Sequence, residues 1–320
     1  MKTRFWVFAL ALPIVVLGVS VVAAQEGPEE IILEHHNLFP EGIEYDEAGQ
    51  RFLLSSATEG TIHEVADDGS VQPFIEDEDL TSSAGIEIDH INNRLLVAIG
   101  DPRPFFVSQD PDASKQAWLG SYDLETGARV FLADLSEAYP NSRGNLANDV
   151  AVDAAGNAYV TDTVSPVIYR VDMEGEVSVF LEDQAFSSIN GIVAHPEGYL
   201  LLGAADGLLL KVPLDQPEVI PVELPRNVKF EVTDGMILQP DSSLVMVTFP
   251  MSIIYRLTSD DQWASATRLG VSKGHQVGWG TTVALRGDSV YVIYSYLNYW
   301  MDSLGDRDTF KIVRVDFKDR

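Results

Sequence analysis

Four oxygen-bearing side chains occupy the same position in a repeating pattern of the chain. They are Glu41, Asn148, Asn190 and Asp234, and each stands directly before a glycine or an aspartate in a short, largely apolar segment. Two carboxylates and two amide oxygens are hard donors, which suit Ca²⁺ before Mg²⁺, with waters completing six or seven ligands. Neither Cys nor a cluster of His accompanies them in the sequence, which argues against zinc at this position.

The same residues also have a simpler interpretation. Asn-Gly and Asp-Gly are common turn dipeptides at the ends of strands. A metal site requires more than the right residue types, because the four side chains must also converge in space. Whether they do depends on the elements that carry them.

The segments around these residues recur six times, beginning PEGIEYD, SAGIEID, ANDVAVD, INGIVAH, TDGMILQ and GWGTTVA. Their alternation and β-branched content predict short strands, and more such strands follow in most copies. The equivalent residues are Glu41, Ala84, Asn148, Asn190, Asp234 and Trp279, at spacings of 43, 64, 42, 44 and 45 residues. Four short strands about every 40–45 residues predict an all-β fold, a six-bladed β-propeller.

In a propeller the innermost strand of every blade lies along the central channel, so equivalent positions converge on one axis. The four oxygen ligands are therefore expected to meet there. The last copy shows only three clear strands, and we expect Glu30–Glu34 to complete its blade and close the ring. A pair of β-sandwiches is the alternative fold, but it would not explain why the same segment recurs six times at a nearly constant spacing.

Two long connections are expected to rise over the predicted metal position, namely the segments Asp101–Gly120 and Leu297–Thr309. With Trp279, their aromatic residues are expected to form an apolar substrate rim. The rim residues are Phe105, Phe106, Trp118, Trp279, Tyr299 and Trp300. The alternative is that both loops are surface insertions whose aromatic side chains pack on the propeller.

Among the histidines, His275 is the one expected near the channel mouth, just before Trp279. It is a candidate acid, base or substrate contact, because His titrates near neutral pH. His35 and His36 are adjacent and would point to opposite faces of a strand, so they cannot chelate one ion together. For His63 we expect a surface or core role.

The first 24 residues have the pattern of a secretory signal. Lys2 and Arg4 precede an apolar run from Phe5 to Ala24 that ends in small residues. A retained membrane anchor is the alternative. We expect a secreted or periplasmic monomer in which residues 25–320 form a single propeller domain. A net charge of −28 argues against partners such as nucleic acid or an anionic membrane.

The motifs PEG, NDVAVDAAGNAYVTDT, NGIVAHPEG and TDGM, each in its own repeat, resemble the senescence marker protein (SMP-30)/gluconolactonase family. This family includes regucalcin and is related to the squid-type phosphotriesterase and the paraoxonases. The resemblance, from about Phe39 onward, implies a propeller with one catalytic Ca²⁺ in the channel and leaves a second, structural ion open. It places Glu41, Asn148, Asn190 and Asp234 at the metal positions, with Asp234 as base or nucleophile.

Two neighbouring positions refine the resemblance. Gly235 follows Asp234, as in the gluconolactonase branch of the family. The branch that opens sugar lactones carries an Arg two residues before the first Asn, where this chain has Leu146, with Arg143 the nearest Arg. This difference argues against a sugar acid lactone as the substrate.

The function expected from these features is a Ca²⁺-dependent hydrolase of lactones or related esters. The metal would polarise the carbonyl group, Asp234 would activate water or attack directly, and Glu41 would hold the ion and share proton handling. The alternative is a non-catalytic secreted propeller that binds a ligand or a protein, with a structural Ca²⁺ only. A strictosidine synthase-like enzyme would share the fold without the metal, and the four oxygen ligands argue against it.

Overall fold

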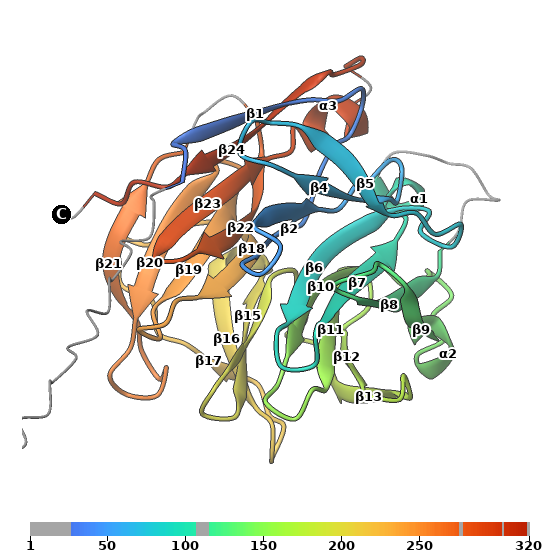
Figure 1. Cartoon of the computed structure of the whole chain (residues 1–320). Helices are drawn as coiled ribbons and strands as arrows, with labels where there is room; N and C mark the ends of the chain where they lie inside the picture. Colours follow the sequence, from blue (N-terminus) through green and yellow to red (C-terminus); the bar gives the residue numbers. More distant parts are fainter. Residues whose placement is uncertain (1–26, 107–114, 275–277, 303, 319–320) are drawn as a thin grey trace, which may run out of the picture.

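The computed structural model describes residues 27–106, 115–274, 278–302 and 304–318. Within these ranges, the strands form six antiparallel sheets of four strands each, arranged around one axis (Figure 1). The predicted six-bladed β-propeller is therefore confirmed. The signal segment predicted for residues 1–24 lies outside the described residues.

The first three blades each run in chain order from the innermost strand outward. Blade one contains β2 (Ile43–Asp46), β3 (Arg51–Leu54), β4 (Ile62–Val65) and β5 (Val71–Ile75). Blade two contains β6 (Ser83–Asp89), β7 (Arg94–Gly100), β8 (Ala117–Asp123) and β9 (Arg129–Asp134). Blade three contains β10 (Ala147–Val152), β11 (Ala158–Asp162), β12 (Val167–Val171) and β13 (Val177–Glu182).

The next two blades follow the same order. Blade four contains β14 (Ile192–His195), β15 (Tyr199–Ala204), β16 (Leu208–Pro213) and β17 (Ile220–Pro221). Blade five contains β18 (Val232–Leu238), β19 (Leu244–Phe249), β20 (Ile253–Thr258) and β21 (Thr267–Ser272). The six innermost strands contact one another in a closed ring, from β2 through β6, β10, β14, β18 and β22 back to β2.

Blade six is built from both ends of the described chain. It contains β22 (Gly280–Arg286), β23 (Ser289–Tyr294), β24 (Thr309–Arg314) and the N-terminal β1 (Glu30–Glu34) as its outer strand. Strand β1 pairs antiparallel with β24 (Figure 1). In this pairing Ile32 lies opposite Lys311. The predicted closure of the ring is therefore confirmed. It joins segments far apart in the sequence and leaves β24 without a free edge.

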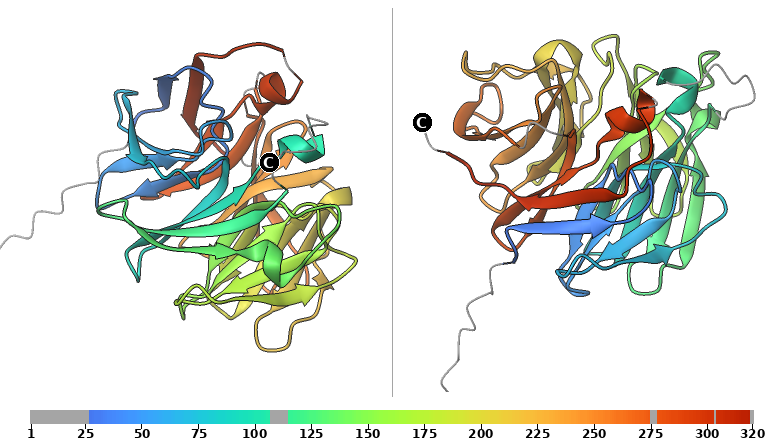
Figure 2. Two further views of the ribbon diagram at one scale, coloured as in Figure 1. Left: turned by 90° about the vertical axis from the view of Figure 1, so that its right-hand side faces the viewer. Right: turned by 90° about the horizontal axis from the view of Figure 1, so that it is seen from above.

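Few helices are present in the described residues, and all are short. They are α1 (Arg103–Phe106), α2 (Leu135–Ala138), the 3-10 turn η1 (Ala205–Gly207) and α3 (Leu297–Met301). Helices α1 and α3 lie in the β7–β8 and β23–β24 connections and come close together on one side of the molecule (Figure 2). Within the described ranges, no helix has the length and apolar character needed to cross a membrane.

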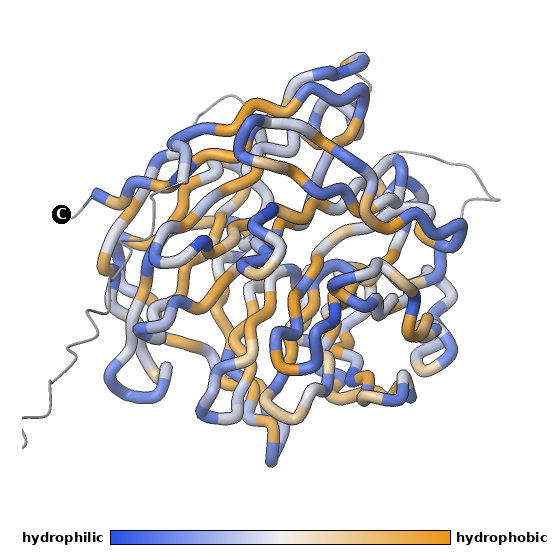
Figure 3. The backbone as a smooth tube through the Cα atoms, in the orientation of Figure 1, coloured by the Kyte–Doolittle hydropathy of each residue, from blue (hydrophilic) through white to orange (hydrophobic). Residues whose placement is uncertain are grey.

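The core lies between neighbouring blades, where apolar side chains of adjacent sheets interlock. Apolar residues follow the strands, and hydrophilic residues gather in the connections (Figure 3). The recurring glycines have a role in this packing near the axis. A Cβ on Gly42 would lie 2.7 Å from the main-chain oxygen of Ala84, and one on Gly85 would lie 2.7 Å from that of Asn148. Only glycine permits this approach of neighbouring innermost strands.

Candidate metal centre and substrate cavity

Glu41, Asn148, Asn190 and Asp234 all line one cavity of about 330 Å³. The cavity lies where the innermost strands begin. Glu41 and Asn190 each lie two residues before β2 and β14, and Asn148 and Asp234 lie near the starts of β10 and β18. The structure thus brings together four side chains that are between 42 and 193 residues apart in the chain. The convergence expected from the repeat is present.

Bulges in the innermost strands help to aim these side chains. The register of β10 against β11 shifts between Ala147 and Val150, and that of β18 against β19 shifts between Thr233 and Met236. Asn148 and Asp234 lie inside these two irregular stretches. A bulge interrupts the regular alternation of side chains and can turn one of them toward a site.

Three of the four residues present an oxygen that the protein leaves without a partner. Glu41 Oε2, Asn148 Oδ1 and Asn190 Oδ1 are buried and have no hydrogen-bond partner among the described residues. An unsatisfied buried polar group costs about 1–3 kcal/mol, so three in one cavity need an explanation. A hard cation provides one, because it would take carboxylate and amide oxygens as ligands. The residues therefore fit a calcium ion.

The electrostatics of the cavity also favour a cation. Burial raises the pKa of Glu41 well above its usual range, and the charges of Asp234 and Asp149 raise it further. Burial likewise raises the pKa of Asp234, as does the charge of Asp149, while a side-chain hydrogen bond from Asn190 acts in the opposite direction. Carboxylates removed from water in this way are stabilised when a positive charge lies beside them.

Asp149 contributes charge without lining the cavity. Its Oδ1 accepts a 3.0 Å hydrogen bond from the main-chain NH of Val150, and its Oδ2 accepts a 3.1 Å bond from that of Ile192. The second bond joins blade three to blade four beside Asn190. Burial raises the pKa of Asp149 to about 7, and these main-chain donors partly offset the effect.

Apart from the four oxygen donors, the cavity is lined mostly by apolar residues. Of the predicted rim residues, Phe106, Trp279 and Trp300 line the cavity. Phe249 lines it as well, with its ring centroid 4.7 Å from that of Trp279 in an edge-on contact. Sequence reasoning missed Phe249, although its place at the end of the second strand of its repeat was a usable signal.

The other three predicted rim residues do not line this cavity. Trp118 lines a separate cavity beside Glu78. Phe105 faces a neighbouring cavity that Arg143 also lines. Tyr299 packs against the core near blade six, and the guanidinium carbon of Arg307 lies 5.3 Å from its ring centroid. Trp118 and Tyr299 pack against apolar clusters of the core.

Two further positions bear on the substrate. Leu146 lines the cavity, whereas the Nη2 of Arg143 donates a 3.2 Å hydrogen bond to the carbonyl of Val164 elsewhere. No Lys, Arg or His is among the described residues that line the cavity. His275, the predicted acid or base, lies outside the described residues.

Comparisons with known proteins agree with this fold. Solved structures similar to this chain include the Malassezia sympodialis allergen Mala s 1, which is 22% identical over 90% of this chain and 96% of that chain, with a TM-score of 0.72. They also include a luciferin-regenerating enzyme, 14% identical, over 91% and 97%, with a TM-score of 0.62. Regucalcin from Agrobacterium tumefaciens, a calcium-binding protein, is 18% identical over 88% and 92%, with a TM-score of 0.57. At these identities the matches support the fold.

No curated protein matches the chain. The sequence model of the SMP-30/gluconolactonase/LRE-like region, however, matches residues 39–281, which is more than half of the chain. The matched region contains Glu41, Asn148, Asn190 and Asp234. The chain therefore belongs to the SMP-30/gluconolactonase/LRE-like family, whose name indicates a lactonase-type propeller.

Proposed function

We propose that this protein is a secreted, Ca²⁺-dependent hydrolase of lactones or related esters. Glu41, Asn148, Asn190 and Asp234 would hold the ion. The observation that carries the proposal is the set of three buried oxygens that have no hydrogen-bond partner among the described residues, in a cavity whose lining is mostly apolar. Family membership adds support, because it connects this fold with lactone hydrolysis.

A bound calcium ion supplies Lewis acidity, which polarises the carbonyl group of a substrate and favours the negative charge that develops on its oxygen. Asp234 is the group that would supply the nucleophile or the base. It would either take a proton from the attacking water or attack the carbonyl carbon itself. The side-chain hydrogen bond from Asn190 would hold Asp234 in position for either role.

The lining of the cavity supports a substrate with an apolar arm. The lining includes four aromatic side chains together with the four oxygen donors, namely those of Phe106, Phe249, Trp279 and Trp300. Leu146 lines the cavity at the position where the branch of the family that opens sugar lactones carries an Arg, so a polar contact available to a sugar is replaced by an apolar wall. An aliphatic lactone or a related uncharged ester fits these walls better.

Turnover of a lactone panel by the purified chain, with and without Ca²⁺, tests the proposal. We expect hydrolysis of aliphatic lactones that depends on Ca²⁺, and weak hydrolysis of sugar acid lactones. Thermal stabilisation by Ca²⁺ without turnover of any lactone or ester would favour the non-catalytic propeller instead. Sequencing the N-terminus of the exported protein tests secretion, and we expect it to begin after Ala24.

A further inference from the structure

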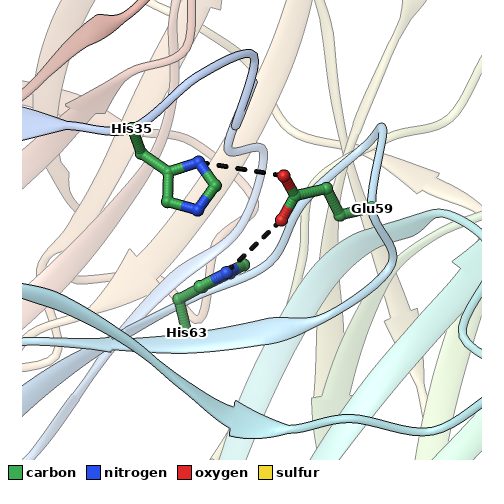
Figure 4. Close-up of side chains that lie close together, drawn as sticks. All are labelled: His35, Glu59 and His63. Atoms are coloured by element: carbon green, nitrogen blue, oxygen red, sulfur yellow. Dashed lines mark ion pairs between the residues drawn. The ribbon is translucent and has the colours of Figure 1, made fainter.

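Away from the channel, His35, Glu59 and His63 face one another (Figure 4). One ligand atom from each residue lies within 4.8 Å of those from the other two. His35 Nδ1 is 3.8 Å from Glu59 Oε1, and His63 Nε2 is 3.4 Å from Glu59 Oε2. None of the three lines the cavity described above.

The fold brings these residues together from two blades. His35 directly follows β1, the strand that closes the ring in blade six. Glu59 lies in the connection between β3 and β4, and His63 lies on β4, both in blade one. The sequence showed no cluster of His, and our expectation that His63 has only a surface or core role did not foresee this grouping. The cluster forms because ring closure places the end of β1 beside blade one.

The separations within the cluster are informative. A good hydrogen bond between nitrogen and oxygen spans about 2.7–3.2 Å, and both contacts to Glu59 are longer. Two ligands about 2.0–2.1 Å from a tetrahedral zinc ion lie roughly 3.4 Å apart. The spacing is therefore closer to that of side chains around a small ion than to that of side chains bonded to one another.

The burial of His63 points the same way. His63 is only 2% exposed. Its Nδ1 is buried and has no hydrogen-bond partner among the described residues. Its other ring nitrogen, Nε2, faces Glu59 and is the atom that would take an ion in the cluster. The side chains of His35 and Glu59 are 27% and 37% exposed, which leaves a path for an ion and room for a water.

We propose that His35, Glu59 and His63 form a second metal site, which binds Zn²⁺ or a similar divalent transition metal. Two imidazoles and one carboxylate are a typical donor set for such ions, with water in the fourth position. This set differs from the four hard oxygens of the channel. An ion here would connect the end of β1 to blade one and so reinforce the closure of the ring.

The chain offers a matched control for this site in His36. Its Nδ1 lies 2.8 Å from Oδ1 of Asp308 on the exposed surface, and it takes no part in the cluster. His36→Ala therefore removes a neighbouring imidazole without removing a proposed ligand. His35→Ala removes one ligand, and Glu59→Gln replaces the carboxylate by a neutral and weaker donor, both at partly exposed positions. The buried His63 is left intact so that the core is not disturbed.

The test measures Zn²⁺ binding by calorimetry and by thermal unfolding, using the full-length chain without a polyhistidine tag. Saturating Ca²⁺ is present throughout, so that the channel oxygens are already occupied if they bind it. We expect one Zn²⁺ per chain and a higher unfolding temperature, because an ion that binds only the folded state stabilises it. His36→Ala should behave like the wild type.

Loss of an outer-shell partner already weakens metal binding by about 10–100-fold, so His35→Ala and Glu59→Gln should weaken it by at least about 100-fold. Circular dichroism without zinc checks that the variants fold. If His35→Ala does not fold, the binding of Zn²⁺ by the exposed variant Glu59→Gln decides the test by itself. Absence of Zn²⁺ binding to the wild type, or equal binding by wild type and Glu59→Gln, would overturn the proposal.

Discussion

The hydroxyl of Thr281 in blade six donates a 2.7 Å hydrogen bond to the main-chain carbonyl of Glu41 in blade one. Thr161 in blade three makes the corresponding 2.8 Å bond to the carbonyl of Asn190 in blade four. Both threonines are buried. In each case a blade fixes the backbone of a candidate metal ligand in its neighbour, so the geometry of the site depends on how the blades pack together.

Thr281→Val should therefore weaken the site without touching any ligand. It keeps the shape but leaves the buried carbonyl of Glu41 without this donor, which should lower the free energy of unfolding by about 1–3 kcal/mol. We also expect weaker Ca²⁺ binding, because the backbone of Glu41 is less firmly held. Urea unfolding and calcium titration measure the two effects. Thr281→Ser retains the hydroxyl and should retain both properties, whereas equal losses in both variants would contradict a role for the hydrogen bond.

Removal of calcium should lower both the unfolding temperature and any lactone hydrolysis, because the ion would bind only the folded state. Added Ca²⁺ should restore both, and Zn²⁺ should not restore hydrolysis. Differential scanning fluorimetry and a turnover assay on the chelator-treated protein follow the two quantities. In Glu41→Gln, which removes one carboxylate from the cavity, the response to Ca²⁺ should shrink. An unfolding temperature that is indifferent to chelator and to Ca²⁺ would rule out the channel site.

Asp234→Asn should abolish most of the turnover while the fold persists. The amide keeps the shape and an oxygen ligand but cannot act as a base, and general base catalysis contributes about 10²–10⁴-fold. Steady-state kinetics at saturating Ca²⁺ measure the loss in kcat. Asp241→Asn, a similar change at a surface residue that pairs with Arg256, should leave kcat unchanged. Near-normal turnover by Asp234→Asn would move the chemistry to another group, with His275 the next candidate.

The aromatic residues allow a test of the cavity as the substrate site. Phe106→Ala and Trp300→Ala remove apolar walls of the cavity, so KM should rise more for long-chain than for short-chain lactones. Trp118→Ala serves as the control, because Trp118 lines a different cavity. Kinetics over a series of chain lengths give the comparison. If Trp118→Ala changes chain-length preference as strongly as the other two variants, the substrate does not bind where we propose.

The sequence by itself determined the architecture of this protein. A sequence segment that recurs six times predicted the six blades. The strand pattern of Glu30–Glu34 predicted how the ring closes. Both are readable because strand alternation and turn residues are local signals that repeat with a fixed period. The same periodicity predicted the convergence of Glu41, Asn148, Asn190 and Asp234, since equivalent positions in a closed ring must face one axis.

Only the tertiary structure decided which side chains outside the repeat meet. Phe106 reaches the cavity and its neighbour Phe105 does not, because the course of a loop and the direction of a side chain depend on packing rather than on spacing. Phe249 enters the wall through its contact with Trp279. The grouping of His35 with Glu59 and His63 is the clearest case, because these residues share no repeat position and meet only where β1 closes the ring against the neighbouring blade.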